Sequence, residues 1–161
     1  MCSQTQKPVK ITPMENNEAK QNPYYSKEDT VKLNVSNEEW KKILSPDLYA
    51  VAREAATERA FTGKYNEYDE VGDYYCAVCG HHLFRSTSKF ASSCGWPSFF
   101  EADKNGVTYV RDSSHGMERI EVICKRCDSH LGHVFNDGPA PTGMRYCMNS
   151  ISLQFEPDGQ K

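Results

Sequence analysis

The order of apolar and polar residues separates a polar N-terminal segment from a longer region with clear periodicity. Residues 1–33 are rich in Asn, Gln, Lys and Glu, and their apolar residues show little periodicity. Such a segment cannot bury enough apolar surface to offset the entropy that ordering costs. We therefore predict a flexible N-terminal tail over 1–33 and one folded domain over 34–157.

Two short helices are predicted at the start of this domain. The sequence Ser36-Asn37-Glu38-Glu39 is a capping box, and the apolar residues that follow it lie on one helical face: Trp40, Ile43 and Leu44. Pro46 suits the first position of a second helix, because its missing N–H would have no partner there. Leu48, Val51 and Ala52 give this second helix an apolar stripe, and it should end before Gly63.

Beyond Gly63, short runs of β-branched and aromatic residues alternate with turns, which is typical of antiparallel strands. These runs are Tyr74-Tyr75, Leu83-Phe84, Val107 to Val110, Ile120 to Ile123 and Tyr146 to Phe155. The last run follows the Pro- and Gly-rich segment 137–143, which cannot continue a ladder. Read as one strand, this run and Arg145 before it place six residues on one face: Arg145, Cys147, Asn149, Ile151, Leu153 and Phe155. This half of the domain is predicted to be mainly β.

Composition and charge narrow the possible partners. The 161 residues include 38% hydrophobic and 25% charged residues, which suits one soluble domain. A net charge of -3 argues against binding to nucleic acid or to acidic membranes. No apolar stretch is long enough to span a bilayer, and the polar start, Met1 to Lys7, is unlike a secretory signal. We expect a cytoplasmic monomer.

One cysteine pattern occurs twice and predicts a metal site. Cys76-x-x-Cys79-Gly80-His81-His82-Leu83 returns as Cys124-x-x-Cys127-Asp128-Ser129-His130-Leu131. Two such pairs offer four thiolates to a tetrahedral Zn²⁺, at about 2.3 Å from each sulfur. Zinc bound by His130 and His133 is disfavoured, because Cys127-x-x-His130-x-x-His133 is too compressed for a zinc finger. Four cysteines also leave no open position for the water of a zinc hydrolase.

Cys2, Cys94 and Cys147 remain without metal, and the last two could be reactive thiols. Arg145 precedes Cys147 by two residues, and a nearby guanidinium favours a thiolate. His130 and His133 can supply hydrogen-bond donors, or a proton near neutral pH. The alternative is that Cys147 is an inert buried thiol and Arg145 a surface residue.

Cys94 lies in Cys94-Gly95-Trp96-Pro97, where Gly and Pro indicate a turn. A thiol on a mobile turn can approach an oxidised cysteine and condense with it to a disulfide. Trp96 could form the wall of a small apolar pocket. Alternatively, Trp96, Phe99 and Phe100 are core residues beneath a loop.

Taken together, several segments resemble the methionine-R-sulfoxide reductases, the type B enzymes. The resemblance covers about 38 to 155 and includes both cysteine pairs. Its other pieces are Cys94-Gly95-Trp96-Pro97-Ser98-Phe99, His115-Gly116-Met117, His130-Leu131-Gly132-His133-Val134-Phe135, Asp137-Gly138-Pro139 and Arg145-Tyr146-Cys147-Met148-Asn149-Ser150.

This resemblance implies a fold of two small antiparallel sheets with short N-terminal helices and a structural Cys₄ zinc site. It implies that Cys147 is the nucleophile and Cys94 the resolving cysteine, with His133 and His130 as candidates to protonate the sulfoxide oxygen. The implied substrate pocket includes Trp96, His130, His133 and Asn149, and we expect Arg145 and Phe135 to bind substrate as well. The expected cycle reduces free or protein-bound methionine-R-sulfoxide through a Cys147 sulfenic acid and a Cys94–Cys147 disulfide. Thioredoxin is the implied reductant, and repair of oxidised proteins is the implied role.

A non-catalytic zinc-ribbon module that binds a ligand in an aromatic cage is the main alternative. Such a module needs neither Cys147 nor Cys94. A nucleic-acid-binding zinc protein is a weaker rival, since the chain has no basic stripe.

Overall fold

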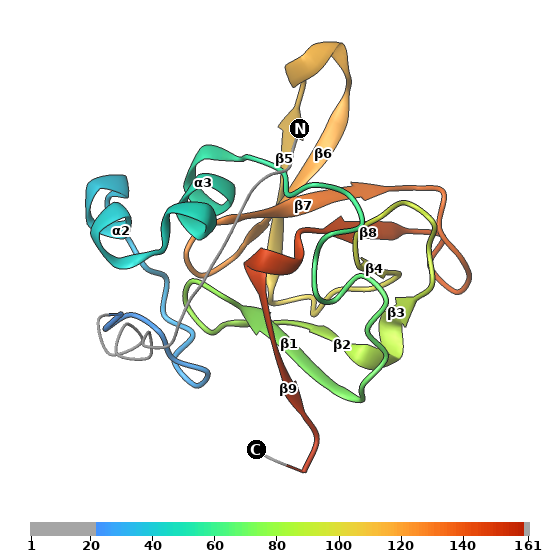
Figure 1. Cartoon of the computed structure of the whole chain (residues 1–161), viewed down its shortest axis with the longest axis horizontal. Coiled ribbons are helices and arrows are strands. Elements are labelled where there is room, and N and C mark those ends of the chain that lie inside the picture. Colours follow the sequence, from blue (N-terminus) through green and yellow to red (C-terminus); the bar gives the residue numbers. More distant parts are fainter. Residues whose placement is uncertain (1–21, 160–161) are drawn as a thin grey trace.

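Residues 22–159 are described by the computed structural model, and they form two antiparallel sheets with two helices to one side (Figure 1). The helices are α2 (Asn37–Ile43) and α3 (Pro46–Glu54). The strands are β1 (Gly72–Cys76), β2 (His82–Arg85), β3 (Lys89–Phe90), β4 (Ser98–Phe99), β5 (Val107–Asp112), β6 (Arg119–Cys124), β7 (His130–Phe135), β8 (Arg145–Met148) and β9 (Leu153–Pro157). The predicted fold class, mainly β with short N-terminal helices, is confirmed.

Both helices begin where the sequence indicated. The Ser36 hydroxyl accepts a hydrogen bond from Glu39 N at 3.1 Å, and the Ser45 hydroxyl caps α3 ahead of Pro46. Each cap pairs a backbone N–H group that has no partner within its helix. Trp40 of α2 is buried, as are Val51 and Ala52 of α3, so the predicted apolar faces point inward.

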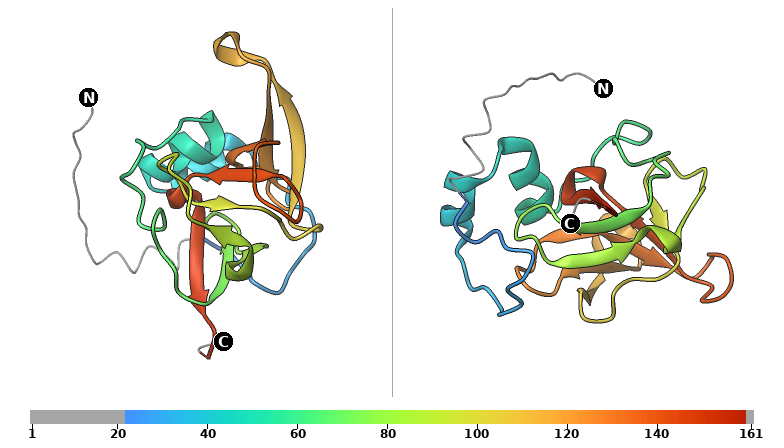
Figure 2. Two further views of the ribbon diagram at one scale, coloured as in Figure 1. Left: turned by 90° about the vertical axis from the view of Figure 1, so that its right-hand side faces the viewer. Right: turned by 90° about the horizontal axis from the view of Figure 1, so that it is seen from below.

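The two sheets differ in size and share one core. The smaller sheet has the order β2-β1-β9, and the larger has the order β3-β4-β8-β7-β6-β5. Rings of the two sheets meet between them: Phe84 stacks on Phe99 at 4.2 Å between centroids, and Tyr74 meets Phe99 edge-on at 5.1 Å. The β5–β6 hairpin extends beyond the rest of the larger sheet (Figure 2).

The final run of the chain is not one strand, so that expectation is wrong. β8 belongs to the larger sheet and β9 to the smaller, and a 3-10 turn, η3 (Ser150–Ser152), lies between them. Asn149 makes this corner, because its backbone N–H and its side-chain amide both donate to Leu131 O, at 2.9 and 3.0 Å. The alternation of faces therefore stops at the end of β8. Strand β7, whose apolar pattern is interrupted by His and Gly, was not predicted.

Residues 22–33 contain no helix or strand, yet they contact the body of the fold. The buried Arg126 guanidinium donates to Tyr24 O, Val31 O and Cys79 O at 2.8–3.1 Å. The Tyr24 ring also packs edge-on against Trp40, at 5.2 Å between centroids. These contacts attach residues 22–33 to the folded domain. Residues 1–21, with Cys2, lie outside the described part of the chain.

Across the described residues, no helix is both long and apolar enough to cross a membrane.

Candidate active site and four-cysteine cluster

Strand register places the predicted nucleophile in a row of polar residues on one face of the larger sheet. Cys147 of β8 lies opposite His133 of β7 on one side and Ser98 of β4 on the other. His133 in turn lies opposite Glu121 of β6. Residues directly opposite each other on antiparallel strands point to the same face. The sheet thus brings together a thiol, an imidazole, a carboxylate and a hydroxyl from four strands.

The thiols of Cys94 and Cys147 face each other at this site. Their Sγ atoms lie 3.3 Å apart, and both residues are partly exposed. The Cys94 sulfur also lies 3.4 Å from Ser98 Oγ. Gly95 follows with a φ of 101°, a conformation that side chains rarely adopt, so this sharp turn depends on glycine. A disulfide requires an S–S distance of about 2 Å, so a small movement of the turn would join the two sulfurs.

The two thiols differ in acidity. Burial raises the pKa of Cys147 to about 12; Cys94 adds to this shift and the Arg145 guanidinium opposes it. For Cys94, burial acts against the thiolate, but hydrogen bonds with Ser92, Ser98 and Cys147 outweigh it and lower the pKa to about 7. Two thiols this close titrate as a pair, which gives one thiolate near neutral pH. Arg145 acts in the expected direction, but burial outweighs it.

Both predicted histidines are paired with carboxylates. His130 Nδ1 lies 2.6 Å from Glu121 Oε2, and His133 Nε2 lies 2.7 Å from Asp112 Oδ2. Burial lowers the pKa of His130, while Glu121 opposes that shift. Within the described residues, His130 Nε2 is buried and has no hydrogen-bond partner. Asp112 was not singled out from the sequence; the register of the β5–β6 hairpin brings it to the site.

Asp112 supports a pH-dependent prediction. The Ser114 hydroxyl and backbone N–H, and then His133, hold the pKa of the Asp112 carboxyl well below its usual value of 3.8. Because the unfolded chain binds this proton more tightly, the carboxylate stabilises the folded state above about pH 4. That contribution is lost as the pH falls through the lowered pKa of the folded state. Asp112→Asn should therefore lower the thermal unfolding midpoint near neutral pH.

The deficit of Asp112→Asn relative to wild type should shrink below about pH 4, because the unfolded wild-type chain then binds the proton and the stabilisation by the folded carboxylate falls. Unfolding midpoints of both proteins across this range would check it. Glu118→Gln is the control, because Glu118 is an exposed carboxylate that pairs with Arg111 on the same hairpin. A deficit that grows as the pH falls would contradict the assigned pKa direction.

The residues predicted to form the substrate pocket differ in their hydrogen bonds and ring contacts. Trp96 is half-buried, and its indole N–H donates to Glu58 O at 3.0 Å. The Arg145 guanidinium lies 4.5 Å from the centroid of the Phe135 ring, opposite it in the sheet, and is also paired with Asp137. Asn149 is buried and bonds to backbone groups, Leu131 O and Glu58 N.

Four buried cysteines form a separate cluster. One ligand atom from each of them lies within 4.8 Å of the others: Cys76, Cys79, Cys124 and Cys127. The Cys76–Cys127 and Cys79–Cys124 sulfur distances are 3.7 and 3.6 Å. A tetrahedral Zn²⁺ with four thiolates has sulfur–sulfur distances of about 3.8 Å, so these residues fit the ion. His81 and His82 bond elsewhere, to Asn105 O and to two carboxylates.

The cluster joins the two sheets. Cys76 ends β1 of the smaller sheet, and Cys124 ends β6 of the larger sheet. After each pair the chain turns through a left-handed residue, Gly80 or Asp128. In each turn the N–H of that residue donates to the carbonyl of the first cysteine at 2.8 Å. The repeated sequence pattern therefore forms a repeated local structure.

A thiol pair beside two histidine–carboxylate pairs fits the class of oxidoreductases, and the β scaffold also carries four cysteines that could hold a metal ion. The family model described as the SelR domain matches residues 44–157. The chain belongs to this family, and the membership predicted from the sequence is confirmed.

Several curated relatives with high identity to this chain carry the name peptide methionine sulfoxide reductase MsrB. The protein of Leptospira interrogans serogroup Icterohaemorrhagiae serovar Lai is 54% identical over 125 residues, which is 77% of this chain and 95% of the relative. That of Pseudomonas savastanoi pv. phaseolicola is 55% identical over 127 residues, 78% of this chain and 97% of the relative. That of Bradyrhizobium diazoefficiens is 56% identical over 123 residues, which is 76% of this chain and 88% of the relative. Among solved structures, the Mis18 'Yippee-like' domain covers 56% of this chain at 21% identity with a TM-score of 0.43, a weak likeness.

Proposed function

We propose that this chain is a peptide methionine sulfoxide reductase that uses Cys147 as nucleophile and Cys94 as resolving cysteine, with specificity for the R sulfoxide. Family membership supports the reaction class. The observation that carries the residue roles is the 3.3 Å separation of two partly exposed sulfurs. A non-catalytic zinc-ribbon module has no use for such a pair.

In the first step, Cys147 attacks the sulfoxide sulfur from the protonation state of the pair in which Cys147 is the thiolate and the more acidic Cys94 carries the proton. The sulfoxide oxygen is transferred with a proton to Cys147, which leaves a sulfenic acid and releases methionine. His133 lies opposite Cys147 in the sheet, and its pairing with Asp112 holds the imidazole in place. We assign His133, with His130 beside it, to polarise or protonate the oxygen.

In the second step, Cys94 attacks the sulfenic sulfur, and water leaves as the disulfide forms. The net change is the reduction of one sulfoxide by two thiols. We propose thioredoxin as the dithiol that returns the disulfide to two thiols. Oxidised proteins and peptides are the proposed substrates, which makes repair the biological role.

The substrate pocket is proposed to lie around the thiol pair. Trp96 would contact the methyl group of the sulfoxide through its ring. Phe135 and Arg145 lie two residues along their strands from His133 and Cys147, on the same face of the sheet. Asn149 is proposed to fix the chain after Cys147, because both ends of its amide bond to backbone groups.

Zn²⁺ is the proposed ion of the four-cysteine cluster. Thiolates suit this ion, and four of them close its coordination sphere. When bound, the ion supplies folding free energy. It has no part in the steps above.

Mapping the disulfide tests the proposal directly. The reduced full-length protein is mixed with one equivalent of methionine-R-sulfoxide, and its cysteines are then alkylated and located by mass spectrometry. One methionine per chain and a Cys94–Cys147 link are expected, because these are the adjoining sulfurs outside the metal cluster among the described residues. The S sulfoxide is the matched control and should yield neither product. A link through another cysteine, or no methionine, would overturn the assignment.

A further inference from the structure

Residues 58–61 bridge the two chain segments that carry the reactive thiols. Trp96 Nε1 donates to Glu58 O at 3.0 Å, and Phe61 N donates to Gly95 O at 2.7 Å, so this bridge holds the turn after Cys94. On the other side, Glu58 N donates to Asn149 Oδ1 at 2.9 Å, two residues after Cys147. One short segment thus has hydrogen bonds to both sides of the thiol pair.

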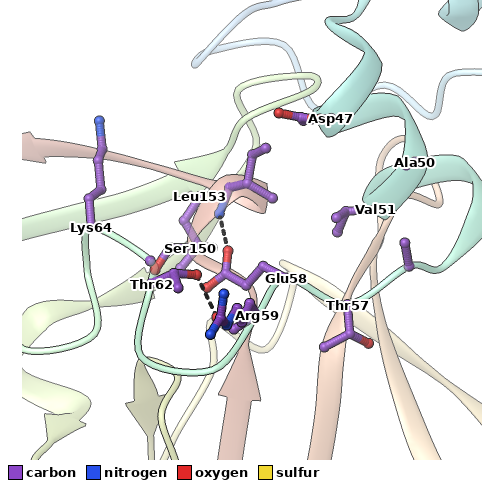
Figure 3. Close-up of a pocket in the computed structure, with 13 residues that line it drawn as sticks. Asp47, Ala50, Val51, Thr57, Glu58, Arg59, Thr62, Lys64, Ser150 and Leu153 are labelled. Atoms are coloured by element: carbon purple, nitrogen blue, oxygen red, sulfur yellow. Dashed lines mark hydrogen bonds between the residues drawn. The ribbon is translucent and has the colours of Figure 1, made fainter. Parts of the chain in front are cut away.

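The side chain of Glu58 anchors this bridge. Its Oε1 atom accepts a hydrogen bond from Ile151 N at 3.0 Å, while Oε2 is buried and without a hydrogen-bond partner in the described structure. Figure 3 shows the carboxyl pointing from its loop toward the Ser150 segment. Burial raises the pKa of this carboxyl, against the hydrogen bonds of Ser150 and Ile151. Glutamine at this position keeps the length of the side chain and an oxygen that can accept a hydrogen bond from Ile151 N.

One side of the loop that carries Glu58 faces a pocket. The loop lines a pocket of about 720 Å³ next to α3 and η3, so one side of it is not packed against the core. Gly63 closes the loop around the carboxyl, and a Cβ at this position would collide with Glu58 Oε2 and Ser150 Oγ. A methyl group at Gly63 would therefore displace this carboxyl.

We propose that Glu58 is a positioning residue that sets the approach of Cys94 to Cys147, and so the rate of disulfide closure after the sulfenic acid forms. This inference rests on the proposed function. Closure must shorten a distance of 3.3 Å to that of a covalent bond, with Cys94 in line with the departing oxygen. A displacement of about 1 Å can slow such an aligned reaction about 100-fold. Cys94 forms no bond in the attack of Cys147 on bound sulfoxide. At saturating sulfoxide a shift of Trp96 affects only substrate binding, so the first step should be spared.

Single-turnover kinetics of the full chain separate the two steps. At saturating methionine-R-sulfoxide, quenched samples are assayed for released methionine and for the Cys94–Cys147 disulfide. In Glu58→Ala and in Glu58→Asp, which is too short to reach Ile151 N, we expect closure to slow about 10- to 100-fold. Methionine release should stay within about 2-fold of wild type. Glu58→Gln should close at the wild-type rate, because its amide oxygen can accept from Ile151 N.

Two further variants sharpen the test. Gly63→Ala should reproduce the slow closure of Glu58→Ala, because it displaces the same carboxyl. Glu67→Ala removes an exposed carboxylate from the same loop and should match wild type in both steps.

Closure at the wild-type rate in both Glu58→Ala and Glu58→Asp would overturn the inference. So would equal slowing of both steps together with a lowered unfolding midpoint, because that pattern indicates general loss of structure. A Glu58→Gln variant as slow as Glu58→Ala would also overturn it. If the wild-type protein itself forms no Cys94–Cys147 disulfide, the proposed function fails first, so the two failures are distinguishable.

Discussion

Cys147→Ser should abolish methionine formation from methionine-R-sulfoxide, with a loss of more than about 1,000-fold in turnover. A serine hydroxyl at this position cannot provide the nucleophilic sulfur that accepts the sulfoxide oxygen. The substitution replaces one small, partly buried side chain with another, so the fold should remain intact. Chromatographic assay of methionine, with circular dichroism as the check on folding, measures both expectations.

Cys94→Ser is the matched variant, since it removes the other sulfur of the pair. It should release about one methionine per chain and then stop with thioredoxin as reductant, because the sulfenic acid on Cys147 has no partner thiol. A sulfenic-acid trap such as dimedone should label Cys147 in this variant. If Cys147→Ser retains turnover, or if Cys94→Ser forms no methionine, the two assigned roles are contradicted.

Loss of the metal cluster should cause the largest fall in stability. Cys124→Ser removes one of four ligands from a site that joins the two sheets. A structural zinc site of this kind supplies much of the folding free energy of a small domain. We expect a loss of about 5 kcal/mol or more, which corresponds to a thermal midpoint about 10–20 °C lower for a chain of this size.

Elemental analysis should find one zinc per wild-type chain, and chelation should reproduce the lowered midpoint. Cys94→Ser is the control, because it removes a cysteine outside the cluster and should retain the metal. In a sample that is still folded after partial chelation, activity should follow the folded fraction. Selective loss of turnover in folded, metal-free protein would contradict a purely structural role.

Features that depend on local chemistry could be predicted from the sequence. The Ser36 and Ser45 caps need only neighbouring backbone N–H groups, and the helices begin where these residues indicated. The two-residue spacing within each cysteine pair is that of metal ligands, and the two pairs lie together in the fold. The break between β8 and β9 could not be predicted, because it depends on Asn149 bonding to Leu131, a residue from another strand.

The pKa values of the thiols and the contacts between side chains at the site were harder to predict. Arg145 beside Cys147 suggested an acidic thiol, but burial has the larger effect on the pKa of Cys147, and burial is not visible in a sequence. Asp112 and Glu58 carry no local signal of their contacts with His133 and Trp96. Those contacts depend on strand register and on loops that cross the fold.

Two sulfur atoms held 3.3 Å apart give each molecule the two electrons that one sulfoxide consumes. Under the proposed function, an oxidised substrate protein can therefore be reduced and can dissociate before the reductant binds. The substrate protein and the reductant would bind the same face of the enzyme at different times, so one small surface would be sufficient for both.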